Sequence, residues 1–250
     1  MDKKRILLVV SYDGTDYHGW QMQENEDTIE GKLNEALTKL TGTPIEVIGA
    51  SRTDAGVHGM CNLAVFDSEM NIEPEKYATA LNSMLPDDIV VRRSLAVKDN
   101  FHPRKIKTKK TYRYRIDNSQ FPDPLKRRYC WHVSYILDID LMRQGAKYML
   151  GSHDFSSFCA SGSTAVSHVR SIDSIEIGKI ENEIYIDVTG GGFLYNMVRI
   201  IAGTLMDVGR GKIEPEQIKD IIEAKDRTKA GPTAPPEGLT LLNIDWEMKQ

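Results

Sequence analysis

The chain is organised around residues 49–59, which read Gly49-Ala50-Ser51-Arg52-Thr53-Asp54-Ala55-Gly56-Val57-His58-Gly59. This stretch lies between two short β-like runs, Ile45–Ile48 and Leu63–Phe66. Its three glycines and two alanines carry little side-chain bulk, so another backbone segment or a ligand can approach closely. If the backbone is extended here, the cation Arg52 and the carboxylate Asp54 share a face. This charged pair at a strand end predicts a functional site, although Asp54-Ala55-Gly56 is also typical of a plain turn.

Composition bounds the class of protein. The 250 residues are 40% hydrophobic and 27% charged, which is ordinary for a globular protein with one large or two small domains. There is no apolar run of about eighteen residues, and Ile6–Val10 ends at Ser11 without a cleavage pattern, so we expect a first strand rather than a signal peptide. The three cysteines are far apart and form no Cys-x-x-Cys, which favours a reducing compartment. We therefore expect a cytoplasmic protein.

The sequence contains no recognisable cofactor or metal motif. The six histidines are scattered, and no histidine pair has the spacing of a zinc site. Gly190-Gly191-Gly192 lacks the lysine and the spacing of a phosphate-binding loop. We expect neither a metal nor an ATP or dinucleotide cofactor.

Charge is unevenly distributed along the chain. The net charge is −4, yet residues 102–115 contain seven basic residues and no acidic one. A second basic cluster, Lys126-Arg127-Arg128, follows. Tyr112 and Tyr114 interleave with the first cluster, which favours RNA as the partner, with phosphate contacts from the cations. A solvated charged loop is the alternative for such a run.

Hydrophobic periodicity predicts an α+β fold. In the first half we expect a strand, a helix capped by Thr28, the strands Ile45–Ile48 and Leu63–Phe66, a helix opening near Pro74, and the strand Ile89–Arg93. The order β-α-β-β-α-β is that of a ferredoxin-like sandwich.

The second half follows a similar plan. The expected elements are the strand Tyr112–Ile116, a helix capped by Asp140, the strands Ile172–Ile177 and Ile184–Val188, a helix Phe193–Met206, a short helix opened by Pro215, and the strand Leu239–Trp246. We therefore predict two ferredoxin-like subdomains, residues 1–104 and 105–250, with mostly antiparallel sheets flanking a central active-site cleft. Residues 118–128 contain two prolines and are expected to form a surface loop.

Three further residues are candidates for a site, each with an ordinary alternative. Arg199 lies within an apolar run, so its guanidinium requires a buried carboxylate or a path to water. Tyr112 is either a strand aromatic that packs on the sheet or a platform for a base. Leu239 follows Pro235-Pro236-Glu237-Gly238 and is either an apolar wall of a site or part of an ordinary turn into a core strand.

The string Arg52-Thr53-Asp54-Ala55-Gly56-Val57-His58 closely resembles the signature of the tRNA pseudouridine synthase A family. The resemblance spans nearly the whole chain, and two differences, Lys105-Ile106-Lys107 and Ser51, concern RNA contacts rather than the chemistry. Further matching motifs are Tyr12-Asp13-Gly14, Gly19-Trp20-Gln21, Asp99-Asn100-Phe101-His102, Tyr112-Arg113-Tyr114, His153-Asp154-Phe155, Met197-Val198-Arg199 and Ala224-Lys225-Asp226-Arg227.

The resemblance implies roles for the candidate residues. Asp54 is implied as the catalytic carboxylate, Arg199 as its partner, Tyr112 rather than Tyr114 as the active-site tyrosine, and Leu239 as an apolar wall of the uracil pocket. Arg52, on the same loop as Asp54, is our candidate to fill the space of an extruded base and to hold phosphates.

The function implied is isomerisation of uridine to pseudouridine in the anticodon stem-loop of tRNA, at positions 38 to 40, by a homodimer that needs no cofactor. We expect tRNA as the partner and neither membrane nor DNA. Two rival hypotheses are a non-catalytic RNA-binding module and a hydrolase that uses Asp54 and His58 on a small molecule.

Overall fold

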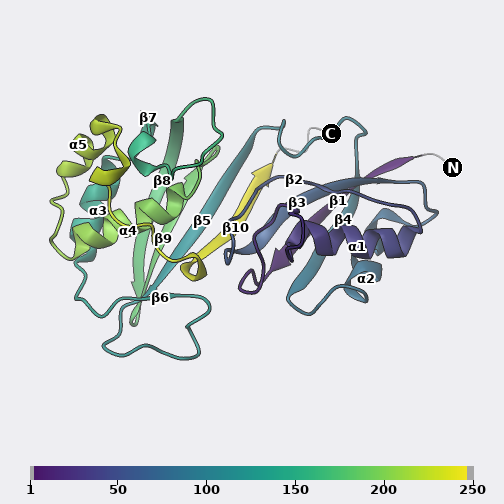
Figure 1. The fold of residues 1–250 in the computed structure, drawn as a ribbon, viewed down its shortest axis with the longest axis horizontal. Helices are drawn as coiled ribbons and strands as arrows, with labels where there is room; N and C mark the ends of the chain where they lie inside the picture. Colours follow the sequence, from purple (N-terminus) through teal and green to yellow (C-terminus); the bar gives the residue numbers. More distant parts are fainter. Residues whose placement is uncertain (1–2, 247–250) are drawn as a thin grey trace. The chain divides into compact units, whose positions relative to one another are not determined.

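The computed structural model describes residues 3–246 and divides the chain into two compact units (Figure 1). The first unit holds the described residues up to Thr108 together with those from Leu241 onward, and the second holds Lys109–Thr240. Each unit combines helices with a mostly antiparallel sheet, which confirms the predicted α+β class. The two ferredoxin-like subdomains expected at residues 1–104 and 105–250, with a cleft between them, stay a prediction.

The first unit follows the predicted order of elements. They are β1 (Lys4–Tyr12), α1 (Ile29–Thr41), β2 (Ile48–Gly49), β3 (His58–Ser68), the 3₁₀ turn Pro74–Lys76, α2 (Tyr77–Asn82) and β4 (Ile89–Val97). The strands lie in the order β4-β1-β3, and β2 pairs with β3. Every one of these pairs is antiparallel, as in a ferredoxin-like sandwich.

Apolar side chains of β1 and the two helices form the core of this unit. Alternate residues of β1, among them Ile6 and Leu8, share one buried cluster with Leu33 of α1 and Leu81 of α2. The helix α1 begins as predicted, because the Thr28 hydroxyl accepts a hydrogen bond from the Gly31 amide.

The strand expected at Ile45–Ile48 is wrong for most of its length. Only Ile48 joins Gly49 in pairing with β3. The Val47 amide instead donates to the Asn34 side chain at 2.9 Å, and the Ile45 amide donates to the Thr38 hydroxyl at 3.1 Å. Side chains of α1 thus satisfy backbone groups that a strand ladder would otherwise use.

The remaining elements lie wholly or partly in the second unit. They are β5 (Thr108–Asp117), β6 (Trp131–His132), α3 (Ile139–Lys147), β7 (Gly151–Asp154), the 3₁₀ turn Ser156–Phe158, β8 (Val169–Ile180), β9 (Glu183–Gly190), α4 (Met197–Gly209), α5 (Gln217–Ala224), the 3₁₀ turns Arg227–Lys229 and Pro236–Gly238, and β10 (Leu239–Trp246). The sheet order is β5-β9-β8-β7, and the short β6 runs parallel to β5. The strand β10 begins in this unit and ends in the first.

Two helix starts differ from the sequence prediction. Asp138, rather than Asp140, caps α3, because its carboxylate accepts from the amides of Asp140 and Leu141. The helix α4 begins at Met197 rather than Phe193. Asn196 has a φ of 57°, a left-handed conformation that cannot continue a helix in the N-terminal direction. Both predicted strands exist as β8 and β9, and β9 alternates as predicted. The predicted alternation is wrong for β8, because a register shift between Ile172 and Ser174 interrupts it.

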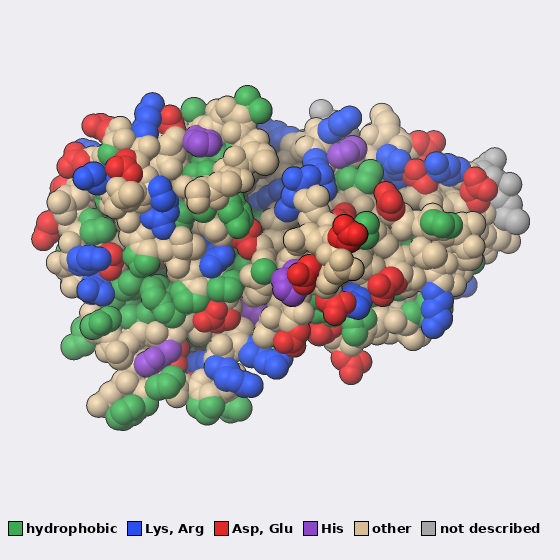
Figure 2. Space-filling view, viewed as in Figure 1, with side chains coloured by type: hydrophobic (Ala, Val, Ile, Leu, Met, Phe, Trp, Pro, Cys, Tyr) green, Lys and Arg blue, Asp and Glu red, His purple; other side chains and the backbone are tan. Residues whose placement is uncertain are grey.

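The expected surface loop at 118–128 is confirmed. After β5 the chain projects as a loop without helix or strand, visible below β6 in Figure 1. Phe121 and Leu125 are exposed on it, together with the basic Arg127 and Arg128. Figure 2 shows blue and green side chains gathered near this loop. Asp117 anchors its start by accepting from the Ser119 hydroxyl and the Asp123 amide.

Candidate functional site

The segment 49–59 contains a tight turn at Asp54. The Val57 amide donates to the Asp54 carbonyl at 3.1 Å, and Gly56, the third residue of the turn, has a φ of 75°. Glycine adopts this left-handed conformation without steric cost, which explains its presence at the third position. The turn considered from the sequence is therefore real. It is formed by the backbone, and the Asp54 side chain beside it is half-buried.

Two segments near the N-terminus hold this loop. The Trp20 amide donates to the Thr53 carbonyl at 3.0 Å, and the Gly56 amide donates to the Tyr17 carbonyl at 3.1 Å. A Cβ atom on Gly19 would clash with Thr53, and one on Gly14 would overlap the Val57 carbonyl. Gly14 and Gly19 belong to the motifs Tyr12-Asp13-Gly14 and Gly19-Trp20-Gln21. The motifs therefore act as a backbone clamp on the Asp54 loop.

The loop's own glycines accommodate aromatic rings. A Cβ on Gly49 would overlap the Trp20 indole, and a Cβ on Gly59 would lie 2.6 Å from the Tyr12 ring. The small residues at both ends of the loop thus serve packing within the first unit.

Asn62 is a supporting residue of the Asp54 loop that sequence reasoning missed. It is fully buried on β3, and its carboxamide oxygen accepts from the Ser51 amide at 3.2 Å while its nitrogen donates to the Ser51 carbonyl at 2.9 Å. The nitrogen also lies 3.4 Å from the Tyr12 hydroxyl, which contacts the Thr53 hydroxyl at 2.9 Å. One amide side chain therefore fixes the residues on both sides of Arg52. The available signal was a polar residue inside an apolar strand run.

His58 is buried against the first motif. The Gly14 amide donates to His58 Nδ1 at 3.0 Å, and the Asp13 carboxylate lies 3.1 Å from the same nitrogen. This ring nitrogen therefore connects β3 to the Tyr12-Asp13-Gly14 segment. Because these contacts explain His58 structurally, they weaken the hypothesis of a hydrolase that uses Asp54 and His58.

Two arginines give this part of the first unit positive charge. Arg52 is exposed, and Arg104 Nε donates to the Gly49 carbonyl at 2.7 Å, at the start of the loop. Burial lowers the pKa of Arg104, and the positive charge of Arg52 lowers this pKa further. The two guanidinium groups are therefore near enough to repel each other, an arrangement that an anion would stabilise.

The second unit holds Tyr112 on β5, opposite Val188 of β9. The Tyr112 ring is 8% exposed and meets Phe193 edge to face, with ring centroids 5.3 Å apart. Its neighbour on the same face, Tyr114, is fully buried, and its hydroxyl donates to the Pro235 carbonyl at 2.8 Å. The sheet thus gives the two tyrosines different environments.

Arg199 is half-buried in the first turn of α4. Its Nε donates to the Ala234 carbonyl, and its Nη1 donates to the Asn196 side chain, both at 2.7 Å. Leu239, the first residue of β10, is 5% exposed. Arg52 and Asp54 thus share a loop of the first unit, while Tyr112, Arg199 and Leu239 belong to the second. The pairing of Asp54 with Arg199 stays a prediction.

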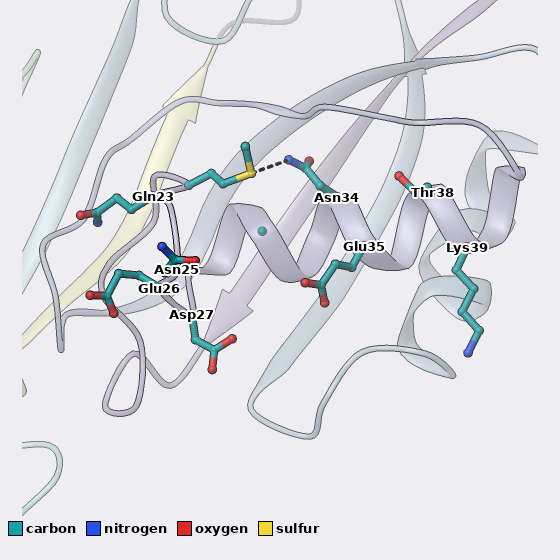
Figure 3. A pocket seen from close by; sticks show the side chains of 10 residues that line it. Gln23, Asn25, Glu26, Asp27, Asn34, Glu35, Thr38 and Lys39 are labelled. Carbon is teal, nitrogen blue, oxygen red and sulfur yellow. Dashed lines mark hydrogen bonds between the residues drawn. The ribbon is translucent and has the colours of Figure 1, made fainter.

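An open groove of about 790 Å³ lies in the first unit, between α1 and the preceding loop (Figure 3). Its lining includes the acidic side chains of Glu26, Asp27 and Glu35. Such a lining repels phosphate, so this groove is a poor candidate for RNA. Across residues 3–246 no group of histidine, cysteine and acidic side chains is arranged to hold a metal ion. No helix of this described part has the length and apolar character to cross a membrane.

Comparison with known proteins identifies the class. The family model described as "tRNA pseudouridine synthase" matches residues 8–104 and 146–247. The matched segments include the Asp54 loop, its N-terminal clamp, α4 and β10. The chain belongs to the family of tRNA pseudouridine synthases, isomerases that convert uridine in tRNA to pseudouridine.

Individual relatives are similar over almost their full length. The tRNA pseudouridine synthase A of Thermoanaerobacter sp. (strain X514) is 50% identical over 241 residues, covering 96% of this chain and 99% of the relative. The protein of the same name from Acetivibrio thermocellus is 47% identical with the same coverage. That of Brevibacillus brevis is 44% identical over 245 residues, covering 98% and 99%.

Proposed function

We propose that this chain isomerises uridine to pseudouridine in the anticodon stem-loop of tRNA, at positions 38, 39 and 40, with Asp54 as the catalytic carboxylate. The observation that carries the proposal is the clamped loop, in which backbone hydrogen bonds and Asn62 fix the residues around Asp54 in a member of this family. A catalytic group held by rigid neighbours keeps the geometry that its reaction needs.

The reaction rearranges atoms without net gain or loss. The bond between ribose C1′ and uracil N1 breaks, the uracil rotates, and a bond forms between C1′ and C5. The C5 proton is released and N1 regains a proton, so neither a redox partner nor a phosphoryl donor is consumed. We propose that Asp54 acts in its ionised form, either by attacking the base or ribose or by removing the C2′ proton.

We propose that Arg199 pairs with Asp54. A guanidinium beside the carboxylate favours its charged form and orients it. Tyr112 would then offer an aromatic face to the extruded uracil, and Leu239 an apolar wall. The hydrogen bonds of Arg199 to Ala234 and Asn196 restrain its guanidinium, as a group that orients a carboxylate requires.

The RNA itself would be held by positive charge. A base in a stacked stem-loop must be flipped out before it can react. The exposed Arg52 is our candidate to occupy the vacated position and to contact phosphates, with Arg104 beside it. The basic residues of 104–115 and the projecting loop at 126–128 would grip the arm. We also propose a cytoplasmic homodimer, whose mass in solution light scattering would be twice 28.2 kDa.

The decisive experiment uses an unmodified tRNA transcript and purified protein, without added cofactor or metal. Carbodiimide labelling and primer extension map pseudouridine for the wild type and for Asp54→Asn. We expect stops in the anticodon arm for the wild type alone. Tight tRNA binding without stops from either protein would instead establish a non-catalytic RNA-binding module.

A further inference from the structure

Residues 227–239 follow α5, end at the first residue of β10 and lie along α4; this segment is called the strap below. Arg227 holds its first half by donating to the Gly231 carbonyl and the Thr233 hydroxyl, both at 2.9 Å. The Gly231 amide donates to the Thr204 hydroxyl of α4 at 2.9 Å. A Cβ on Gly203 would overlap the Pro232 carbonyl, so helix and strap are in direct backbone contact.

Two adjacent carbonyls of the strap accept hydrogen bonds from side chains of α4 and β5. The Ala234 carbonyl accepts from Arg199 Nε at 2.7 Å, and the Ala234 amide donates back to the Arg199 carbonyl at 3.1 Å. The next carbonyl, that of Pro235, accepts from the Tyr114 hydroxyl at 2.8 Å. Side chains of α4 and β5 therefore hold two consecutive peptide groups of the strap.

The Tyr114 ring also packs against the end of the strap, at Gly238. A Cβ on Gly238 would lie 2.6 Å from Tyr114 Cζ, so only glycine fits against this ring without displacement. The next residue is Leu239. Through the 3₁₀ turn Pro236–Gly238, the buried tyrosine thus determines where β10 begins.

The environment keeps the Tyr114 hydroxyl a donor. Burial raises the pKa of Tyr114 well above its ordinary value. The charge of Glu237 also raises this pKa, whereas that of Arg199 lowers it, which places both charges near the ring. The hydroxyl consequently stays protonated across the pH range of any activity assay.

We infer that Tyr114 is a positioning residue, which fixes the Arg199 guanidinium and the Leu239 side chain through the strap. The inference rests on the proposed function, in which those two residues line the uracil site. Without the hydroxyl, Pro235 loses its anchor, and the neighbouring Ala234 carbonyl no longer holds Arg199 Nε in place. Displacement of a group beside the reacting atoms by about 1 Å costs about a hundredfold in rate.

The first test compares Tyr114→Phe with Tyr185→Phe on the same tRNA transcript. Both changes remove one tyrosine hydroxyl from the sheet of the second unit, and Tyr185 keeps its ring contact with Arg113. We expect Tyr114→Phe to lower kcat about tenfold to a hundredfold, with KM for tRNA changed by less than about threefold. Tyr185→Phe should behave like the wild type. A kcat for Tyr114→Phe equal to that of Tyr185→Phe would overturn the inference.

A double-mutant cycle separates positioning from general destabilisation. Lysine at position 199 lacks the guanidinium Nε that the Ala234 carbonyl accepts from. If Tyr114 acts through Arg199, Tyr114→Phe should lower kcat much less in an Arg199→Lys background than in the wild type. Effects that multiply independently would count against the inference.

Hydrogen exchange provides a readout that does not require activity. The Ala234 amide, which donates to the Arg199 carbonyl, should exchange its hydrogen faster in Tyr114→Phe than in the wild type. The exchange rates of the amides in the Asp54 loop should remain unchanged. Unaltered exchange at Ala234 would contradict the inference whatever the protein catalyses. Absence of pseudouridine from the wild type, by contrast, would refute the proposed function alone.

Discussion

The Asp54 loop and the strap both carry candidate site residues on irregular backbone, yet they are held in different ways. Backbone hydrogen bonds to Trp20, Tyr17 and Leu63 hold the loop, together with glycines that allow close approach and the Asn62 side chain. The strap is fixed mainly by side chains, since Arg227, Arg199 and Tyr114 donate to its oxygens.

This difference predicts different sensitivities. A backbone-held loop is damaged by an added atom that separates the two chains, whereas a side-chain-held strap is damaged by a removed donor. The placement of the proposed catalytic carboxylate on the loop suits this contrast. Backbone contacts hold the loop without occupying the side chains that must meet RNA.

The largest expected effect is that of Asp54→Asn, which leaves every loop contact described above in place. Because asparagine cannot act as a carboxylate nucleophile or base, we expect kcat to fall by about 10⁴-fold or more. Filter binding should show tRNA affinity within about threefold of the wild type, since the interaction with phosphates is unchanged. Residual turnover above about a tenth of the wild-type rate would exclude Asp54 as the catalytic group.

Gly19→Ala tests the backbone clamp. Gly19 has a φ of 87°, and an added Cβ would lie 2.5 Å from the Thr53 carbonyl oxygen. Gly42 is the matched control, with a φ of 72° and nothing within 4 Å of its added Cβ. We expect Gly42→Ala to cost about 1 kcal/mol in the free energy of unfolding and Gly19→Ala about 3 kcal/mol, measured by urea denaturation. Equal losses would mean that strain, rather than close approach, determines Gly19.

Arg199→Leu tests the proposed ion pair from the side of the second unit. Because its proposed partner Asp54 is the proposed catalytic carboxylate, we expect a loss of about a hundredfold in kcat and a much smaller loss of tRNA affinity. Steady-state kinetics and filter binding on one transcript separate the two quantities. Equal losses of affinity and turnover would instead assign Arg199 to RNA binding.

The accuracy with which the sequence predicted helix and strand bounds depends on how far apart in the sequence the determining contacts lie. Local signals gave the Thr28 cap of α1 and the bounds of β10, Leu239–Trp246, because capping and alternation are properties of neighbouring residues. The start of α4 was wrong, since a left-handed asparagine has no distinct sequence signal. The residue that caps α3 was also misplaced by two positions, because both aspartates satisfy the same local pattern.

The candidate site shows the same limit. Arg52 and Asp54 were identifiable because they stand in a short string with a family signature. The clamp at Gly19, the bridging Asn62 and the grip of Tyr114 on Pro235 depend on contacts that are distant in sequence, 121 residues apart for the last pair. No local pattern encodes such contacts.

The smallest expected effect distinguishes two neighbouring cations of the first unit. Arg104 anchors the Gly49 carbonyl at the start of the loop, whereas Lys105 is an exposed charge in the same basic run. Replacing either by methionine removes one positive charge, so both variants should weaken the salt dependence of tRNA binding, with the slope falling by about one. Only Arg104→Met also loosens the Asp54 loop, and we expect its kcat to fall about fivefold while that of Lys105→Met stays at the wild-type value. Identical kinetics for the two variants would show that the backbone contacts of the loop suffice without Arg104. The contrast between a backbone-held loop and a side-chain-held strap would then be sharper than the structure alone indicates.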